Sequence, residues 1–501
     1  MMSSSLPQAP IRAIVGRFSY DVSRQVMEEV LAKQPFEFCG VLSTGSEQLF
    51  AGLPVSQQQW FSSSDVRGCN YQGVDWNELE PVDEELLERM YECESVFMDM
   101  VYRLEWKRSI PYATRKRWYL RHLRFWNDYL SRYRINLYLS AWMPHEIPDI
   151  VIYYLCKARN IPVLYFDASA VRDTSFAEHD IKESSIQISR RFSELLAEYA
   201  GIQNPQLIPL NERFEKRYQA LTAAGGELPP LETIRHATYW GRVRRLLWEK
   251  PAASLRYSLQ YFTPRGVMRC FGALRRARVI RTRNAFYNEH AVEPDFNEKF
   301  VYMTLHFQPE ASTTPMAGVY RDQLLIAQLL NAHLPDDVLI YVKEHPRESG
   351  WLNRSVDYYR DFLTLTKVRF IKREVDTFAL REHCQAIATG TGTIGFEGLF
   401  RGKPVFLFGH RFYQYAPGVY RIHSSDDCRK AVQAIFHEGR VPTLLESRLY
   451  LKAMEETCVH GVLNPWHHKV THLSDQEHIR ANVTALMQEL ERLQSAIAST
   501  H

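Results

Sequence analysis

The sequence predicts an α/β protein with two domains, each built on a doubly wound, mostly parallel sheet. The chain has 501 residues, whereas one domain typically holds about 100–200. Apolar runs of strand length alternate with helical segments in two separate regions, around residues 135–166 and 300–408. Strand–helix–strand units of this length give parallel sheets that helices cover on both faces.

The clearest unit of the N-terminal half consists of INLYLSA (135–141), a helix over 148–159 and IPVLYF (161–166). Proline is favoured in a first helical turn, where Pro148 stands, and both apolar runs have the length of buried strands. Residues 44–81 are polar and rich in turn residues. The other elements expected in this half are strands 12–15 and 36–43 and helices 20–33, 83–104 and 113–133.

The C-terminal half alternates more regularly. Its expected strands are 300–307, 338–342, 368–371, 386–389 and 405–408, and helices are expected over 321–332, 356–366, 377–383 and 393–401. Five strands with intervening helices make a doubly wound sheet.

These elements divide the chain into an N-terminal domain (1–204), a basic helical insertion or interdomain segment (205–294), a C-terminal domain (295–424) and C-terminal helices (425–501). Residues 235–283 contain thirteen Lys and Arg residues and one acidic residue. Basic helices with aromatic residues suit an anionic membrane surface and also nucleic acid, although a solvated helical face explains the pattern at least as well as either. The net charge is only +3, so we expect no nucleic-acid partner.

The composition also indicates the cellular compartment of the protein. No stretch reaches the roughly 18 apolar residues that span a bilayer, and residues 1–10 lack the pattern of a signal peptide. The eight cysteines include no C-x-x-C pair, so neither a disulfide framework nor a structural zinc site is expected. The expected location is the cytoplasm, with the inner face of the plasma membrane as an alternative for a lipid-binding basic segment.

Polar residues follow the predicted strands of the second half, and ligands of open α/β sheets bind beyond the carboxyl ends of strands. A histidine can donate a hydrogen bond to phosphate, and a proline offers a flat apolar face to a base. Small residues let a phosphate approach backbone N–H groups at a helix N-terminus, and a carboxylate one turn later suits ribose hydroxyls. The candidate ligand-binding residues are Gln308, Glu310, Lys343, His345, Pro346, Thr391, Gly392, Thr393, Glu397 and His410.

Candidate catalytic residues follow the strands of the first half. His145, Glu146 and Asp149 come after 135–141, and a histidine or carboxylate in a cleft can deprotonate a hydroxyl group. Asp149 also suits the first turn of a helix through the helix dipole. A second set follows 161–166 and consists of Asp167, Asp173, Glu178 and Asp180.

No metal site is expected. The C-terminal histidines include His468 and His472, one helical turn apart, which a metal could use, but no Cys or carboxylate pattern flanks them. The whole histidine cluster comprises His460, His467, His468, His472 and His478.

Three stretches, VYMTLHFQPEASTTP, LPDDVLIYVKEHP and ATGTGTIGFEGLFRGKPVFLFG, resemble the capsule polysaccharide biosynthesis proteins. That family includes the bacterial Kdo transferases of capsule assembly and, more distantly, is similar to bacterial sialyl- and polysialyltransferases. The resemblance spans residues 301–420, and PHEIPDIVIYYLCKARNIPVLYF resembles the family's N-terminal half. It implies the GT-B architecture, two Rossmann-like domains facing across a cleft. It also implies that His345 and Pro346, with Thr391 and Thr393, hold the CMP part of a CMP-sugar.

The resemblance implies a glycosyltransferase that moves Kdo or a sialic acid from a CMP-sugar onto a capsule or lipopolysaccharide glycan or glycolipid. The sequence contains no D-x-D motif, the pair that many metal-dependent sugar transferases use, so we expect a metal-independent enzyme without a cofactor other than the donor. Two alternatives stay open. One is a UDP-sugar 2-epimerase, which shares the architecture and needs no acceptor. The other is a non-catalytic scaffold in polysaccharide assembly or export, because the family's acidic catalytic motif has no certain counterpart.

Overall fold

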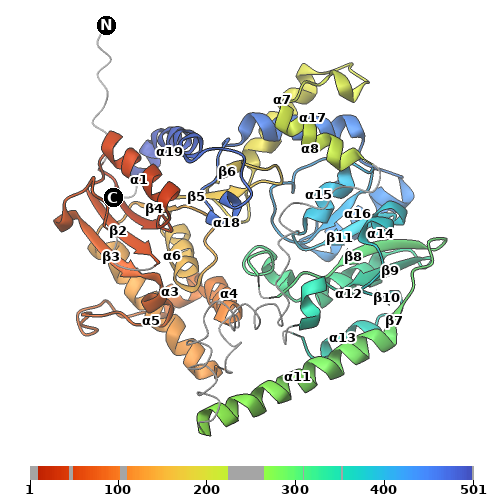
Figure 1. Ribbon diagram of the computed structural model, residues 1–501, viewed down its shortest axis with the longest axis horizontal. Coiled ribbons are helices and arrows are strands. Elements are labelled where there is room, and N and C mark those ends of the chain that lie inside the picture. Colours follow the sequence, from red (N-terminus) through yellow and green to blue (C-terminus); the bar gives the residue numbers. More distant parts are fainter. Residues whose placement is uncertain are drawn as a thin grey trace, which may run out of the picture.

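The computed structural model describes residues 10–44, 49–101, 110–223, 264–308, 310–350 and 354–498. Figure 1 shows two α/β halves side by side, each with a central sheet between helices. Both sheets are dominated by parallel strands, which confirms the predicted GT-B architecture.

The first sheet has the order β3-β2-β1-β4-β5-β6. Its strands are parallel except for β6, which pairs antiparallel with β5. Strands β2 and β4 are buried along their whole length, as expected for strands that helices cover on both faces. The elements of this half are β1 (Arg12–Gly16), α1 (Asp21–Lys33), β2 (Phe38–Ser43), β3 (Gln58–Ser62), α2 (Ser63–Arg67), α3 (Glu84–Arg89), α4 (Tyr91–Val101), α5 (Tyr112–Arg132), β4 (Leu137–Ser140), α6 (Ile147–Ala158), β5 (Val163–Ala168) and β6 (Ser175–Glu178).

The second sheet has the order β13-β12-β11-β8-β9-β10-β7, and its pairs are parallel. The chain proceeds from β8 to one side and then from β11 to the other, so a topological switch point lies between these two strands. The elements are β7 (Ala291–Val292), β8 (Lys299–Thr304), α12 (Leu324–His333), β9 (Val338–Lys343), α13 (Val356–Leu363), β10 (Val368–Ile371), α14 (Thr377–His383), β11 (Ala386–Thr389), α15 (Thr393–Leu399), β12 (Val405–Leu407), β13 (Val419–Arg421) and α16 (Ser425–Val432).

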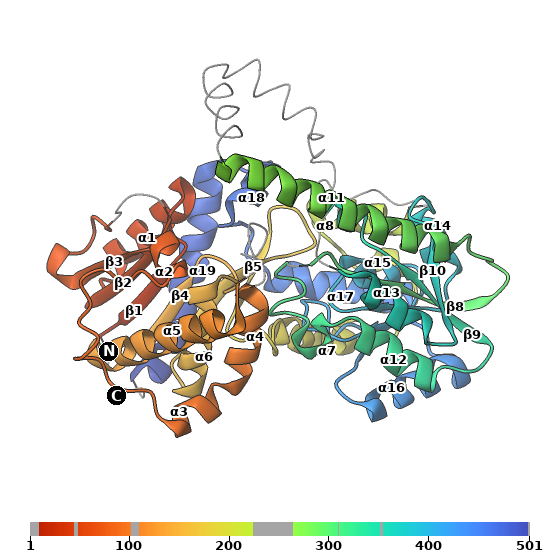
Figure 2. The same ribbon diagram turned by 90° about the horizontal axis from the view of Figure 1, so that it is seen from below.

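The remaining helices tie the two halves together. Helices α7 (Ile186–Glu198) and α8 (Glu212–Thr222) pack against α17 (Leu444–Thr457). After α18 (Pro465–His468), the chain returns to the first half, where α19 (Asp475–Ala498) lies beside α1 (Figure 1). Helix α11 (Pro264–His290) runs beside α13 on the outside of the second half (Figure 2). The predicted domain boundaries at residues 204, 294 and 424 stay predictions.

Most predicted elements are present, with differences at their ends and edges. Over its described part, the predicted helix 83–104 is two helices, because α3 ends at Arg89 and Met90 separates it from α4. Residues 102–104 lie outside the described residues. The predicted strand 300–307 ends at Thr304. The turn-rich segment 44–81 contains β3 and α2, and β3 was missed because its polar residues stand at the edge of the sheet. The other unpredicted strands, β6, β7 and β13, hold four residues or fewer.

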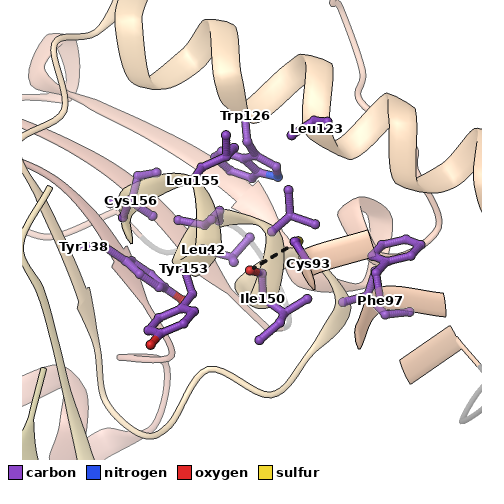
Figure 3. Packing of buried hydrophobic residues seen from close by; sticks show 14 of the residues in the cluster. Leu42, Cys93, Phe97, Leu123, Trp126, Tyr138, Ile150, Tyr153, Leu155 and Cys156 are labelled. Atoms are coloured by element: carbon purple, nitrogen blue, oxygen red, sulfur yellow. Dashed lines mark hydrogen bonds between the residues drawn. The ribbon is translucent and has the colours of Figure 1, made fainter. Parts of the chain in front are cut away.

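Helices α4, α5 and α6 cover one face of the first sheet through a shared apolar core (Figure 3). Trp126 of α5 and Leu155 of α6 are fully buried there, as is Tyr138 of β4. This packing positions the start of α6, which is the part of the helix nearest the carboxyl end of β4.

The basic segment is described in part. Residues 235–263 lie outside the described residues, and 264–283 belong to α11. Among the helices that the structure describes, none combines the length and the hydrophobicity needed to cross a membrane.

We predict that Leu155→Ala destabilises the protein by about 2–5 kcal/mol, because the substitution leaves a cavity among fully buried side chains. Calorimetric unfolding of the intact chain measures the effect. Leu196→Ala is the matched control, since Leu196 is also a helical leucine but is 43% exposed. Equal losses of stability for the two variants would contradict the packing described.

Candidate functional site

A cleft of about 910 Å³ lies between the two halves, within the usual size of ligand pockets. Residues from the carboxyl ends of strands in both sheets line it. Of the residues that the sequence predicts, the cleft is lined by His145, Glu146, Glu310, Lys343, His345, Pro346, Thr391, Gly392, Thr393 and Glu397. It is not lined by Asp149, Gln308 or His410.

The N-terminal wall carries His145 and Glu146 at the start of α6. Nδ1 of His145 lies 2.7 Å from the carbonyl oxygen of Met143. A carbonyl oxygen can only accept, so Nδ1 carries the proton and Nε2 is the acceptor of the neutral ring. Glu146 forms an ion pair with Arg67 at 2.7 Å, so its carboxylate is already charge-paired.

Asp149 does not reach the cleft, although it stands one turn after His145. Its side chain is fully buried, and Oδ2 accepts hydrogen bonds from Nε and Nη2 of Arg17 at 3.0 and 2.7 Å. Burial raises the pKa of Asp149, and the Arg17 guanidinium opposes that shift. Asp149 therefore anchors α6 to the end of β1.

On the C-terminal wall, which the second half forms, His345 and Pro346 follow the end of β9 after one residue, and Pro346 begins a short 3-10 helix. The ring of His345 lies 5.9 Å from that of Phe307. The preceding Glu344 is buried, where it accepts a 2.6 Å hydrogen bond from Nε of Arg373 and another from the hydroxyl of Tyr359. These charge-assisted contacts hold the His-Pro loop in place.

The ammonium group of Lys343 forms hydrogen bonds within the protein. Nζ donates to the carbonyl oxygen of Val375 and to Oγ1 of Thr377, the latter at 3.1 Å. Burial lowers the pKa of Lys343, and Asp376 opposes that shift. The side chain thus fixes the loop between β10 and α14 beside the cleft.

The turn after β11 was expected to present backbone N–H groups to a phosphate, but internal partners occupy three of them. The N–H groups of Gly390 and Thr391 donate to Nε2 of His306, and that of Gly392 donates to Oγ1 of Thr389. The hydroxyl of Thr391 donates to the carbonyl oxygen of Ser312 at 2.6 Å. The side chain of the next residue, Thr393, is exposed and lines the cleft.

Glu397 lies one turn into α15 and lines the cleft as the sequence predicts. Its Oε2 accepts a hydrogen bond from Nη1 of Arg381 at 3.2 Å, and its side chain is 14% exposed. Arg381 thus orients the carboxylate at the cleft wall, and a carboxylate is an acceptor that suits paired hydroxyl groups.

Gln308 and His410 have roles outside the cleft lining. Nε2 of Gln308 donates to the carbonyl oxygen of Arg321 at 2.5 Å. The ring of His410 stacks on that of His423 at 5.7 Å, and burial lowers its pKa.

One member of the second catalytic set, Asp167, also lines the cleft, whereas sequence reasoning did not select several of the other lining residues. Asp167 pairs with Arg411 at 3.2 Å, which connects the two halves across the cleft. The sequence pattern had already selected Asp167, and the position of Arg411 after β12 was the signal that could have found Arg411 as well. Other lining residues that were not selected include Trp142, His306, Asp376 and Asn464. Asn464 precedes α18, so no strand-end pattern points to it.

The other members of that second set lie elsewhere. Asp173 accepts a hydrogen bond from the backbone N–H of His472 at 3.2 Å. Glu178 is buried and accepts from the N–H and hydroxyl of Ser185, both at 2.7 Å, and Asp180 pairs with Lys157 at 2.6 Å.

The C-terminal histidines make structural contacts. Nδ1 of His478 accepts from the N–H of Val462 at 3.1 Å, and Nε2 of His468 donates to the carbonyl oxygen of Val462 at 2.8 Å. Across the residues that the structure describes, no group of three or more His, Cys, Asp or Glu side chains is arranged to hold a metal ion.

Comparisons with known structures return chains with low sequence identity. The beta Kdo 2,7 transferase of KpsC from Thermosulfurimonas dismutans is 12% identical, covering 81% of this chain and 97% of its own, with a TM-score of 0.32. The beta Kdo 2,4 transferase of the same KpsC is 15% identical over 63% of this chain and 79% of its own, with a TM-score of 0.29. The UDP-GlcNAc 2-epimerase of Methanocaldococcus jannaschii is 9% identical over 89% of this chain and all of its own, with a TM-score of 0.25.

The sequence comparisons give one match, to a family model. No curated protein sequence matches the chain at a significant level. Residues 279–437 match the family described as "Capsule polysaccharide biosynthesis protein". This segment contains β8 to β13 and the whole C-terminal wall of the cleft from Tyr302 to Arg411. Over these residues, the chain is similar to the capsule polysaccharide biosynthesis protein family.

Proposed function

We propose that the protein is a glycosyltransferase that binds a CMP-sugar, with Kdo or a sialic acid as the sugar, and transfers it to a capsule or lipopolysaccharide glycan. The supporting observation is that one cleft joins His145 of the first half to His345, Thr393 and Glu397 of the second. A transferase needs this combination, because donor and acceptor must meet between the two walls.

The C-terminal wall would hold the nucleotide. His345 would donate a hydrogen bond to the phosphate, Pro346 would support the base, and Glu397 would accept hydrogen bonds from the ribose hydroxyls. His345 and Arg411 line the cleft, where they would lie near the leaving phosphate. Such groups stabilise developing negative charge, which supports a metal-independent mechanism.

The N-terminal wall would activate the acceptor. The acceptor oxygen forms a bond to the anomeric carbon while the bond from that carbon to the phosphate oxygen breaks. The phosphate takes the electron pair, and Nε2 of His145 takes the hydroxyl proton. The hydrogen bond from Nδ1 to Met143 supports this role because it orients the ring. Glu146 is a weaker choice, since Arg67 already pairs with its carboxylate.

We expect CMP at about 100 times its dissociation constant to stabilise the protein by about 2.7 kcal/mol, which a thermal melt detects. His345→Ala should weaken CMP binding roughly tenfold to a hundredfold, because a hydrogen bond to a charged group is lost. His437→Ala is the matched control, since His437 is an exposed histidine away from the cleft.

A melting temperature that rises with UDP or GDP but not with CMP would overturn the CMP assignment. Product analysis with a UDP-sugar alone tests the epimerase alternative, because an epimerase converts it without an acceptor.

We expect His145→Ala to lower kcat by about 10²–10⁴-fold while CMP affinity stays the same, as is typical for the loss of a general base. Transfer to a glycan acceptor and calorimetric CMP binding measure the two effects. An unchanged kcat would exclude His145 as the base. Cellular capsule assembly that survives both His145→Ala and His345→Ala would favour a scaffold.

We also propose a cytoplasmic protein that touches the anionic inner face of the plasma membrane through α11. Arg275, Arg278 and Arg281 are exposed and three residues apart, which places them opposite the buried Arg283 and Tyr287 of the same helix. A basic residue near an anionic leaflet contributes about 1 kcal/mol to binding.

Flotation with phosphatidylglycerol vesicles at low salt tests this contact. Arg275→Glu combined with Arg278→Glu should release the protein from the vesicles. The charge-matched control is Lys216→Glu with Lys430→Glu, since both lysines are also exposed. Equal binding of the two double variants would exclude α11 as the membrane contact.

A further inference from the structure

His306 lies next to the turn after β11, residues Gly390–Gly392, at the end of the sheet where β8 and β11 are neighbours. Its Nε2 is 3.1 Å from the backbone nitrogen of Gly390 and 3.2 Å from that of Thr391. Oγ1 of Thr389 lies 2.9 Å from the same atom. Backbone N–H groups can only donate, so Nε2 is an acceptor and the ring proton is on Nδ1.

The backbone of His306 is itself fixed. Its N–H donates to Oε1 of Gln323 at 2.6 Å, and its carbonyl oxygen accepts from Nη2 of Arg354 at 2.6 Å. Arg354 is buried 4.0 Å from Glu344, the residue before His345. One buried polar network therefore connects the loops that follow β8, β9 and β11.

The two glycines of the turn leave room for the imidazole ring of His306. A Cβ atom at Gly390 would lie 3.3 Å from the ring of His306, and one at Gly392 would lie 3.0 Å from it and 2.7 Å from Oγ1 of Thr389. These distances are shorter than ordinary van der Waals contact, so glycine is the residue that fits at both positions without a shift of the ring. Burial, with the charges of His345, Arg354 and Arg411, lowers the pKa of His306 to about 3, which keeps the ring neutral at physiological pH.

We propose that His306 is a positioning residue of the donor site, which holds the Gly390–Gly392 turn through Nε2 so that Thr393 and Glu397 face the bound nucleotide. This inference rests on the proposed function. Without the acceptor, two buried N–H groups lose their partner, and each such loss costs about 1–3 kcal/mol. The turn then relaxes away from the geometry that the donor needs.

Three substitutions distinguish the effect of the hydrogen-bond acceptor of His306 from the effect of the size of its ring. Oε1 of glutamine occupies nearly the position of Nε2, whereas Oδ1 of asparagine occupies that of Nδ1, and phenylalanine keeps the ring without an acceptor. We expect His306→Phe and His306→Asn to weaken CMP binding and raise the donor KM about tenfold or more, with a smaller change in kcat. His306→Gln should restore most of the wild-type affinity.

Two measurements on the nucleotide-free protein test the mechanism directly. Nitrogen NMR of the wild type should show an unprotonated Nε2 at His306 at neutral pH. Hydrogen exchange at the amides of Gly390 and Thr391 should accelerate in His306→Phe and stay slow in His306→Gln. A protonated Nε2, or exchange that is equally slow in the phenylalanine variant, would overturn the proposal.

The binding data distinguish this proposal from the proposed function. A wild-type protein that binds no nucleotide would contradict the proposed function and the donor-site role of His306 together. A wild-type protein that binds CMP no better than His306→Phe would overturn the present inference alone.

Discussion

Parallel strands end at the same edge of a sheet, and the two sheets of this protein turn those edges toward one cleft. The loops at the edges carry backbone N–H and C=O groups that no longer have strand partners, and buried groups of this kind need hydrogen bonds. The side chains of His306, Thr389 and Thr391 supply several of these hydrogen bonds. The wall of the cleft is therefore rigid before any ligand arrives, which is the condition for binding at low conformational cost.

Buried charges serve the same purpose. Taking ions out of water is costly, so a buried ion pair is weak evidence for stability. Glu344, Arg354 and Arg373 lie within one cluster under the His-Pro loop, and Arg17 with Asp149 lies under the start of α6. Each cluster stands directly behind residues that line the cleft. Their common effect is to fix the direction of loops rather than to increase overall stability.

The sequence was sufficient to predict the fold because both sheets consist of apolar strands separated by helices with clear ends. The predicted bounds of β10, β11 and α14 match the structure to the residue, and eleven of the candidate residues line one cleft. The sequence could not show that Asp149 points away, because helical spacing gives a face but not the neighbour across it. Likewise, the sequence could not show that the hydroxyl of Thr391 donates to Ser312, or that the ammonium of Lys343 donates to Val375. These partners are distant in the sequence and adjacent only in the fold. The edge strands β7 and β13 depend on pairing rather than on local pattern.

Helix α19 has a consequence for the order in which the protein is assembled. Leu486, Leu490 and Ile497 belong to the same apolar core as Val26 and Leu31 of α1. Ribosomes add about 5–20 residues per second. The segment that forms α19 and completes the core of α1 and β1 is therefore synthesised on the order of tens of seconds after them. During synthesis, the first half exposes an unfilled apolar surface while the whole second half is made, and that interval is when a chaperone would have the most to protect.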